Sequence, residues 1–229
     1  MKKRLFIIGC LWVFGAMHTL QAQANPRLSR EVLSDIVKSI PSSLEISFLI
    51  KDLDITYNNA YINDPAKANG YKTPIKQALN LGVYATDVGY AYLYKKKKTT
   101  QAVLRANMHL AKKLKIWHLF DKKQWKEKAL KSNNFYSLLL QSKTLIEKIS
   151  NHFYEKKQSH LTILMLTGGC LESLYIMVNL AITSPNEFLN YQIGEQKIIL
   201  EQLLLLLSFY EDLPEIKALM GELEKLQKI

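Results

Sequence analysis

Residues Leu161 to Ile182 form a run of 22 residues with one charged side chain, Glu172. The run is long enough to cross a membrane, but an acid at the centre of a span costs roughly 2.5–3.5 kcal/mol on insertion scales. The other helical segments of the chain are amphipathic and need a core to pack against. We therefore expect this run to be a core helix of a soluble bundle rather than a membrane span.

A second segment, residues 73–96, is also apolar nearly all round. It opens with Thr73-Pro74, an N-cap followed by proline at the first helical position. Small residues recur along it at steps of four, three and four: Ala78, Gly82, Ala85 and Gly89. Each glycine in a helix costs about 1 kcal/mol relative to alanine, so two on one stripe indicate close packing against a neighbouring helix.

No long alternation of polar and apolar residues indicates a β-strand. We predict an all-α fold, a compact multi-helix bundle with two nearly fully buried central helices. Residues 54–72 are rich in turn-forming residues and predict a loop with one short helical turn. The predicted helices span residues 29–39, 42–53, 73–96, 99–115, 122–131, 134–157, 160–182, 186–211 and 214–227.

The N-terminus has the layout of a secretory signal peptide. Met1–Arg4 is basic, Leu5–Met17 is apolar, and small residues precede a cleavage point after Ala24. We expect residues 1–24 to be removed, which leaves residues 25–229 as a single helical domain exported to the periplasm or cell envelope.

The two cysteines are separated by this expected cleavage. The residues around Cys10 are similar to a lipobox, but the apolar stretch before it is too short, and we expect no lipid anchor there. Cys170 would then be the single remaining cysteine, so no intrachain disulfide can form. Because it lies in an apolar run, we interpret Cys170 as a small buried hydrophobic residue.

Each of the two apolar helices carries an acid with a tyrosine three residues further on. An unpaired buried carboxylate is costly, so Asp87 and Glu172 need donors or a cavity. Tyrosine hydroxyls and a cation from a neighbouring helix are suitable partners. The candidate ligand-binding residues are Asp87, Glu172, Tyr84, Tyr90, Tyr175 and Asn179.

Three interpretations of this group stay open. It is a structural network that fixes helix register, a pocket for a small polar or cationic ligand, or an acid/base pair of a periplasmic hydrolase, which needs two carboxyl groups at a fixed distance. A non-enzymatic exported binding or envelope-associated protein with this polar site in its core is our leading hypothesis for the function. The hydrolase that uses Asp87 and Glu172 is the alternative.

Motifs of several common enzyme classes do not occur in the chain. There is no Glu-x-x-His pair for a di-iron bundle, no His-Glu-x-x-His, no cysteine pair for zinc and no glycine-rich phosphate loop. We therefore expect no metal and no cofactor, and we assign no catalytic residue.

The segment from Lys95 to Lys131 is strongly basic, with twelve lysines and Arg105 against two acids, Asp121 and Glu127. Lysines beside tryptophans suit an anionic lipid or envelope surface. Nucleic acid would suit the charge equally, but expected export makes it a poor partner. A solvated face without a partner is the other interpretation. The candidate surface residues are Lys95, Lys96, Lys97, Lys98, Lys112, Lys113, Lys115, Trp117 and Trp125.

Two stretches, Asn80–Tyr90 and Leu166–Ile176, together with the signal peptide, carry a family resemblance. They resemble a group of uncharacterised exported or lipid-anchored helical proteins of Gram-negative bacteria. The resemblance covers most of the expected mature chain. It implies an all-helical fold and export, and it implies no activity. Members with a lipobox cysteine differ from this chain, which has only Cys10.

Overall fold

The computed structural model describes residues 28–120, except 43, 44, 46, 48, 49, 51, 52 and 54, and residues 135–228. All regular elements in these ranges are helices, which confirms the predicted all-α class. The α-helices are α1 (Arg30–Ser39), α3 (Pro74–Leu93), α4 (Lys97–Lys113), α6 (Phe135–Glu155), α7 (Ser159–Thr183), α8 (Glu187–Ser208) and α9 (Pro214–Gln227). The 3₁₀ helices are η1 (Asn59–Tyr61), η2 (Pro65–Gly70) and η3 (Trp117–Leu119).

The helix starts follow the capping signals in the sequence. The Thr73 hydroxyl accepts a hydrogen bond from the amide of Lys76 at 3.3 Å, and α3 begins at Pro74. Asn186 caps α8 in the same way, accepting from the amide of Phe188 at 2.9 Å. These contacts satisfy amide groups that the first turn of a helix leaves unpaired.

The predicted loop at 54–72 contains two short helices rather than one. Asn58 caps η1 and Asp64 caps η2, each through a side-chain oxygen that accepts from the amide two residues later. Both residue types favour such local bonds. The predicted helix at 42–53 falls largely outside the described residues, and the one at 122–131 falls entirely outside them.

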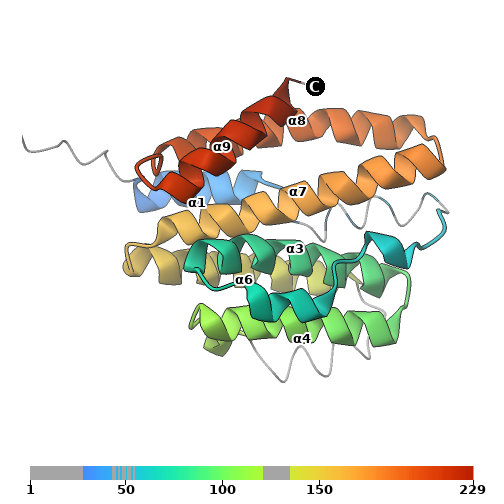
Figure 1. Cartoon of the computed structure of the whole chain (residues 1–229), viewed down its shortest axis with the longest axis horizontal. Coiled ribbons are helices and arrows are strands. Elements are labelled where there is room, and N and C mark those ends of the chain that lie inside the picture. Colours follow the sequence, from blue (N-terminus) through green and yellow to red (C-terminus); the bar gives the residue numbers. More distant parts are fainter. Residues whose placement is uncertain are drawn as a thin grey trace, which may run out of the picture.

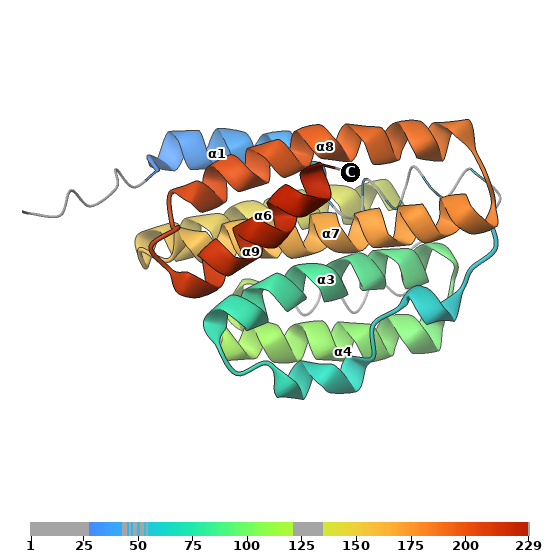
Figure 2. The ribbon, with the colours of Figure 1, turned by 45° about the horizontal axis from the view of Figure 1, so that its top comes forward.

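α3 and α7 lie side by side at the centre of the bundle, with α4 along α3 and α8 along α7 (Figures 1 and 2). α6 also packs on α7, α1 packs on α6, and α9 crosses α8. Most residues of α7 and half of those of α3 are buried, so both helices are central, and α3 is less fully buried than predicted. Within the described ranges α7 alone is long and apolar enough to span a membrane, and 78% of its apolar window is buried, as in a core helix.

Two glycines allow the backbones of α3 and α7 to touch. A Cβ atom on Gly82 would overlap the carbonyl oxygen of Met165 and lie 2.7 Å from the amide nitrogen of Gly169. A Cβ atom on Gly168 would overlap the carbonyl oxygen of Leu79. The close approach predicted from the small residues of α3 is therefore confirmed at Gly82. This contact fixes which side chains of the two helices can meet.

Candidate functional site

The acids of the two central helices meet inside the bundle. Asp87 of α3 is 0% exposed and Glu172 of α7 is 8% exposed. The two carboxyl groups lie close enough for each to shift the pKa of the other. Two ionised carboxylates repel each other at close range in an apolar core, so the pair favours a form in which one group carries a proton. The two acids that the sequence singled out are thus neighbours in the core of the bundle.

A loop amide completes this acid pair. The backbone amide and the side-chain amide of Asn63 both donate to Asp87 Oδ2, at 3.1 and 3.2 Å. Asn63 lies between η1 and η2, so the loop is tied to the buried carboxyl of α3. No lysine or arginine in the described ranges forms an ion pair with either acid. The donor predicted to come from a tyrosine or a cation therefore comes from an asparagine.

Burial sets the charge state of the acid pair. Desolvation raises the pKa of Asp87 far above its usual range, and the two Asn63 bonds only partly oppose this. Desolvation also raises the pKa of Glu172, and the negative charge of Asp87 raises it further. The two acids therefore titrate as a pair, and burial and their mutual repulsion favour a form in which the pair keeps one proton. Near neutral pH the pair carries about one negative charge rather than two.

One carboxyl oxygen of each acid lacks a hydrogen-bond donor among the described residues. Among the described residues, Asp87 Oδ1 and Glu172 Oε1 receive no hydrogen bond from any amide, hydroxyl or cation. The proton that the pair shares is the available partner. A proton or a small cation bound at these carboxyl oxygens would satisfy them.

Tyr84 and Tyr90 are buried beside the acid pair but bond elsewhere. The Tyr84 hydroxyl donates to the carbonyl oxygen of Asp64 at 2.8 Å, and the Tyr90 hydroxyl accepts from the amide of Asn58 at 3.1 Å. Burial raises the pKa of both hydroxyls, so both stay protonated. The two tyrosines anchor the η1–η2 segment on α3, and neither donates to a carboxyl group.

Tyr175 and Asn179 lie further out along α7. Tyr175 is 48% exposed and its ring meets that of Tyr61 edge-on at 6.4 Å. Asn179 donates to the carbonyl oxygen of Tyr175 at 2.8 Å, within its own helix. The contacts of these two residues do not include the acids, so the structure does not bring them together with the acid pair.

Cys170 matches its interpretation as a buried hydrophobic residue. It lies in the core, and burial raises the pKa of its thiol. A thiol of this kind is unreactive because the thiolate is the nucleophile.

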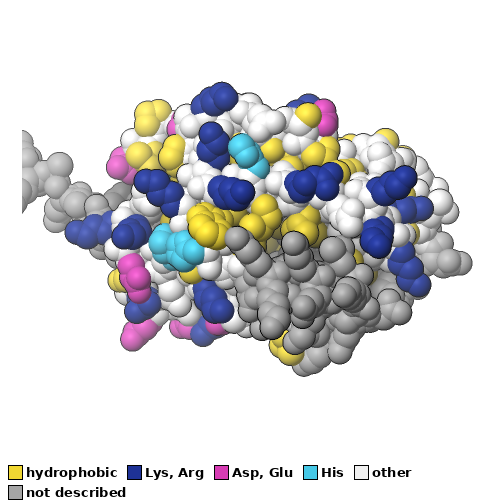
Figure 3. Space-filling view, turned by 90° about the horizontal axis from the view of Figure 1, so that it is seen from below, with side chains coloured by type: hydrophobic (Ala, Val, Ile, Leu, Met, Phe, Trp, Pro, Cys, Tyr) yellow, Lys and Arg dark blue, Asp and Glu magenta, His cyan; other side chains and the backbone are white. Residues whose placement is uncertain are grey.

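The basic segment forms one face of the molecule along α4. Lys98, Arg105 and Lys112 are exposed and lie seven residues apart, so they share one side of the helix. No acid occurs between residues 88 and 120. Figure 3 looks onto this side and shows lysine and arginine side chains spread across it, with described acidic side chains near the margins. Arg105, which was counted in the basic segment but not among the candidate surface residues, joins them because it is exposed on the same side of α4 as Lys98 and Lys112.

Both ends of this row are extended by further basic or aromatic residues. Lys95, Lys96 and Lys97 precede Lys98, and Lys96 Nζ lies 5.0 Å from the ring centre of Tyr57. At the other end Trp117 is 40% exposed and follows the exposed Lys112, Lys113 and Lys115 in the chain. Trp125 lies outside the described residues. We call the following set the basic face: Lys95, Lys96, Lys97, Lys98, Arg105, Lys112, Lys113, Lys115 and Trp117.

The lysines at the start of α4 are placed against the helix dipole. The first turn of α4 contains no acid, and its N-cap, Lys96, makes no side-chain capping bond. The N-terminus of a helix carries a partial positive charge, so cations there are unfavourable by a few tenths of a kcal/mol each. An anion that approaches this end of the helix would relieve the repulsion.

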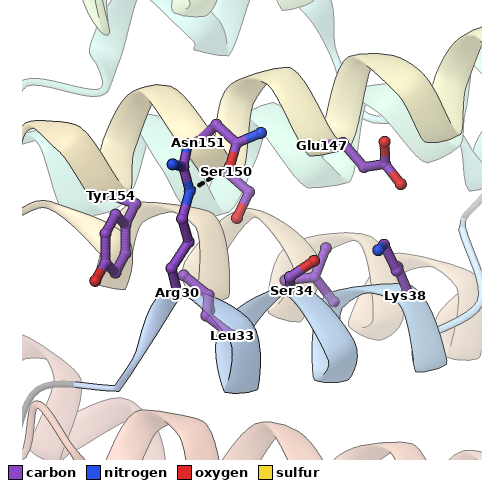
Figure 4. A pocket seen from close by; sticks show the side chains of 9 residues that line it. Arg30, Leu33, Ser34, Lys38, Glu147, Ser150, Asn151 and Tyr154 are labelled. Atoms are coloured by element: carbon purple, nitrogen blue, oxygen red, sulfur yellow. Dashed lines mark hydrogen bonds between the residues drawn. The ribbon is translucent and has the colours of Figure 1, made fainter.

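A surface pocket of about 150 Å³ lies between α1 and α6 (Figure 4). Arg30 Nε donates to Asn151 Oδ1 at 3.2 Å, and the Arg30 guanidinium lies 5.7 Å from the ring centre of Tyr154. The same guanidinium is 3.5 Å from Glu155. No motif in the sequence singled out these residues. Their contacts hold α1 against α6.

No protein family model, curated protein or solved structure matches the chain. Among the described residues, no three histidine, cysteine or acidic side chains gather as a metal site would require.

Proposed function

We propose that the protein is a non-enzymatic, exported binding protein that docks on an anionic surface of the cell envelope through the basic face. The observation that carries the proposal is the exposed row of Lys98, Arg105 and Lys112 in a stretch without acids. At 1.5 Å per residue the row is roughly 21 Å long, so all three cations can reach one flat surface. Each basic residue near an anionic membrane contributes about 1 kcal/mol.

Two further features support lipid headgroups as the anions. The exposed part of Trp117 stands at one end of the row, and tryptophan rings favour the headgroup level of a membrane. The lysines at the N-terminus of α4 lose their unfavourable interaction with the helix dipole when phosphate groups approach. Nucleic acid offers the same phosphate chemistry, but the proposed export and the proposed membership of an exported family favour lipid.

Vesicle sedimentation tests this proposal. All described contacts lie within residues 28–228, so the chain from residue 25 onward retains them and avoids the apolar N-terminal run. We expect this chain to sediment with anionic vesicles at low salt, to be released at high salt, and not to sediment with neutral vesicles. Equal recovery with neutral and anionic vesicles would contradict the proposal.

A matched pair of charge-reversed variants localises the contact. The K98E/R105E/K112E variant reverses the row, and K217E/K225E/K228E reverses the same number of exposed lysines around α9. We expect the first variant to lose vesicle binding and the second to keep most of it, although both change the net charge equally. The same loss in both variants would show that overall charge, and not the basic face, attracts the protein.

A small cationic ligand of the acid pair is a second candidate. The donorless oxygens of Asp87 and Glu172 favour it, since a small cation could replace the shared proton. Thermal denaturation with added metal cations and small primary amines tests this. A ligand should raise the melting temperature of the wild type at neutral pH and leave D87N and E172Q unchanged. Equal shifts in all three proteins would contradict a site at the pair.

The hydrolase alternative receives less support from this geometry. Glycoside cleavage places the two carboxyl groups about 5–5.5 Å apart for retention and about 6.5–9.5 Å apart for inversion, with the sugar between them. Here Asp87 has no exposed surface and Glu172 is 8% exposed, so a sugar cannot reach the two carboxyl groups from solvent. Substrate would have to separate α3 from α7, whose backbones touch at Gly82.

A further inference from the structure

α8 carries apolar side chains on its outer side as well as on its inner side. Tyr191, Ile198 and Leu205 are 62%, 54% and 59% exposed. They are spaced seven residues apart, so they form one stripe along the helix. The opposite side of α8 already supplies the core with these buried residues: Leu189, Ile199, Leu200, Leu203, Leu206 and Leu207. The stripe is therefore additional to what the bundle needs.

The stripe faces out of the bundle. α8 runs along the edge of the molecule in Figures 1 and 2, with α7 beneath it. Its borders are marked by two contacts: Ser39 at the end of α1 donates to Gln202 at 3.4 Å, and Gln227 of α9 donates to Glu201 at 3.3 Å. Between these borders the three apolar side chains point to solvent. Seven-residue spacing of this kind is the pattern by which one helix packs on another.

The stripe is symmetric about Ile198. Tyr191 lies seven residues before it and Leu205 seven residues after it. If a second α8 lies antiparallel across a two-fold axis at Ile198, each Tyr191 meets the Leu205 of the other copy and the two Ile198 side chains meet each other. A two-fold interface needs this self-complementarity, because the same patch serves both copies. Gly194 adds no side chain between Tyr191 and Ile198, and a Cβ there would meet nothing within 4 Å.

The charges beside the stripe suit the same arrangement. Lys197 and Glu201 are both exposed and lie on one flank of the stripe, one turn apart. Within the described ranges, Lys197 forms no ion pair. In the antiparallel arrangement Lys197 of each copy comes within about one turn of Glu201 of the other copy. Two reciprocal ion pairs would then border the apolar centre.

We propose that this outer stripe of α8, formed by Tyr191, Ile198 and Leu205 with the flanking Lys197 and Glu201, is the interface at which a second copy of the chain docks in antiparallel orientation. The interface is small, so the dimer is weak and depends on concentration. It lies on a different helix from the basic face of α4, which leaves that face open in both copies.

Sedimentation velocity of the chain from residue 25 onward, over about 1 to about 100 µM, tests the interface. We expect the wild type to shift from monomer towards dimer across this range and I198E to remain monomeric. I182E is the matched control, since Ile182 is 72% exposed at the end of α7 and lies off the stripe. It should dimerise like the wild type. A wild type that stays monomeric throughout, or an I198E variant that still dimerises, would overturn the proposal.

Charge reversal tests the orientation. K197E and E201K each place like charges opposite one another in the antiparallel dimer, and we expect each single variant to raise the dissociation constant about fivefold to tenfold. The K197E/E201K double variant restores opposite charges in both pairs and should recover dimerisation. Circular dichroism confirms that each variant is folded. If single and double variants dimerise equally, or if the double variant is the weakest, the antiparallel register is wrong.

Discussion

Asp87 of α3 and Glu172 of α7 are buried across the contact between the two helices, close enough for each carboxyl group to shift the pKa of the other. The shared proton lets two acids lie in an apolar core with about one charge between them. Asn63, between η1 and η2, donates twice to Asp87. The acid pair therefore joins three segments that are distant in the sequence.

The stability of the protein should decrease as pH rises towards neutrality. The pKa values of both acids are raised in the folded protein and return to about 4 in the unfolded chain. Their stabilising contribution is complete below about pH 4 and is lost as pH rises through the raised folded values. The folded state then binds more protons than the unfolded state, and the free energy of unfolding falls by up to about 1.4 kcal/mol per pH unit for each proton.

Denaturant unfolding of the wild type and E172Q at several values between about pH 5 and about pH 8 measures this effect. The glutamine side chain introduced by E172Q keeps a donor towards Asp87 and cannot titrate. We expect a flatter profile for E172Q than for the wild type. Histidine titration affects both proteins alike, so it cancels in the difference between them. Parallel profiles would mean that the acid pair does not titrate in this range.

Removing the Asn63 side chain should destabilise the fold. N63A loses one of two hydrogen bonds to a buried carboxylate, and bonds to charged groups contribute about 1.5–3 kcal/mol. N59A is the control, because Asn59 makes side-chain contacts only at exposed positions. We expect chemical denaturation to show a loss of roughly 2 kcal/mol for N63A and less than about 0.5 kcal/mol for N59A. Equal losses would show that Asn63 contributes only as a loop residue.

Gly82 should tolerate no side chain. Alanine there would place its Cβ against the carbonyl group of Met165, and neither backbone can move without separating α3 from α7. We expect G82A to lose at least about 2 kcal/mol of unfolding free energy, or to fail to fold. A Cβ at Gly221 in α9 meets nothing within 4 Å, and G221A should gain about 0.5–1 kcal/mol from helix propensity. Thermal unfolding of the two variants should therefore shift in opposite directions.

Lys157 should be replaceable by glycine with a gain in stability. It has φ of 58° after the end of α6, where its amide bonds to Tyr154 and the amide of Gln158 bonds to Phe153. Glycine is preferred at this position after a helix, because a residue with a side chain loses about 1 kcal/mol of stability in the left-handed conformation. We expect K157G to raise the unfolding free energy by about that amount and K156G, at an ordinary φ, to give no gain. A loss in K157G would show that the lysine side chain makes a stabilising contact.

Some of these features could be predicted from the sequence. Asp87 and Glu172 can be identified because each is a single acid within a long apolar segment. Gly82 can be identified because glycine destabilises a helix and needs a packing reason. The contact between the acids could not be predicted, since it depends on how α3 and α7 are rotated about their axes. That rotation is set by the backbone contact at Gly82 and Gly168.

The hydrogen-bond partners of the acids could not be predicted from the sequence for a different reason. Tyr84 and Tyr90 are spaced along α3 as partners of Asp87 should be. A tyrosine hydroxyl lies far from its own backbone, however, and these two bond to Asp64 and Asn58 in the η1–η2 segment instead. Asn63 is one of several asparagines in a loop, and no periodic pattern marks which of them meets a buried carboxyl group. Loop-to-helix contacts of this kind are determined by the tertiary fold.

The fluorescence of Trp117 tests docking by the basic face most directly. In the chain from residue 25 onward, Trp117 and Trp125 are the two tryptophans, so W125F leaves Trp117 alone. We predict that its emission shifts to shorter wavelength when anionic vesicles are added at low salt, and that high salt or K98E/R105E/K112E abolishes the shift. An unchanged Trp117 spectrum while the protein still sediments with the vesicles would place the membrane contact elsewhere on the molecule.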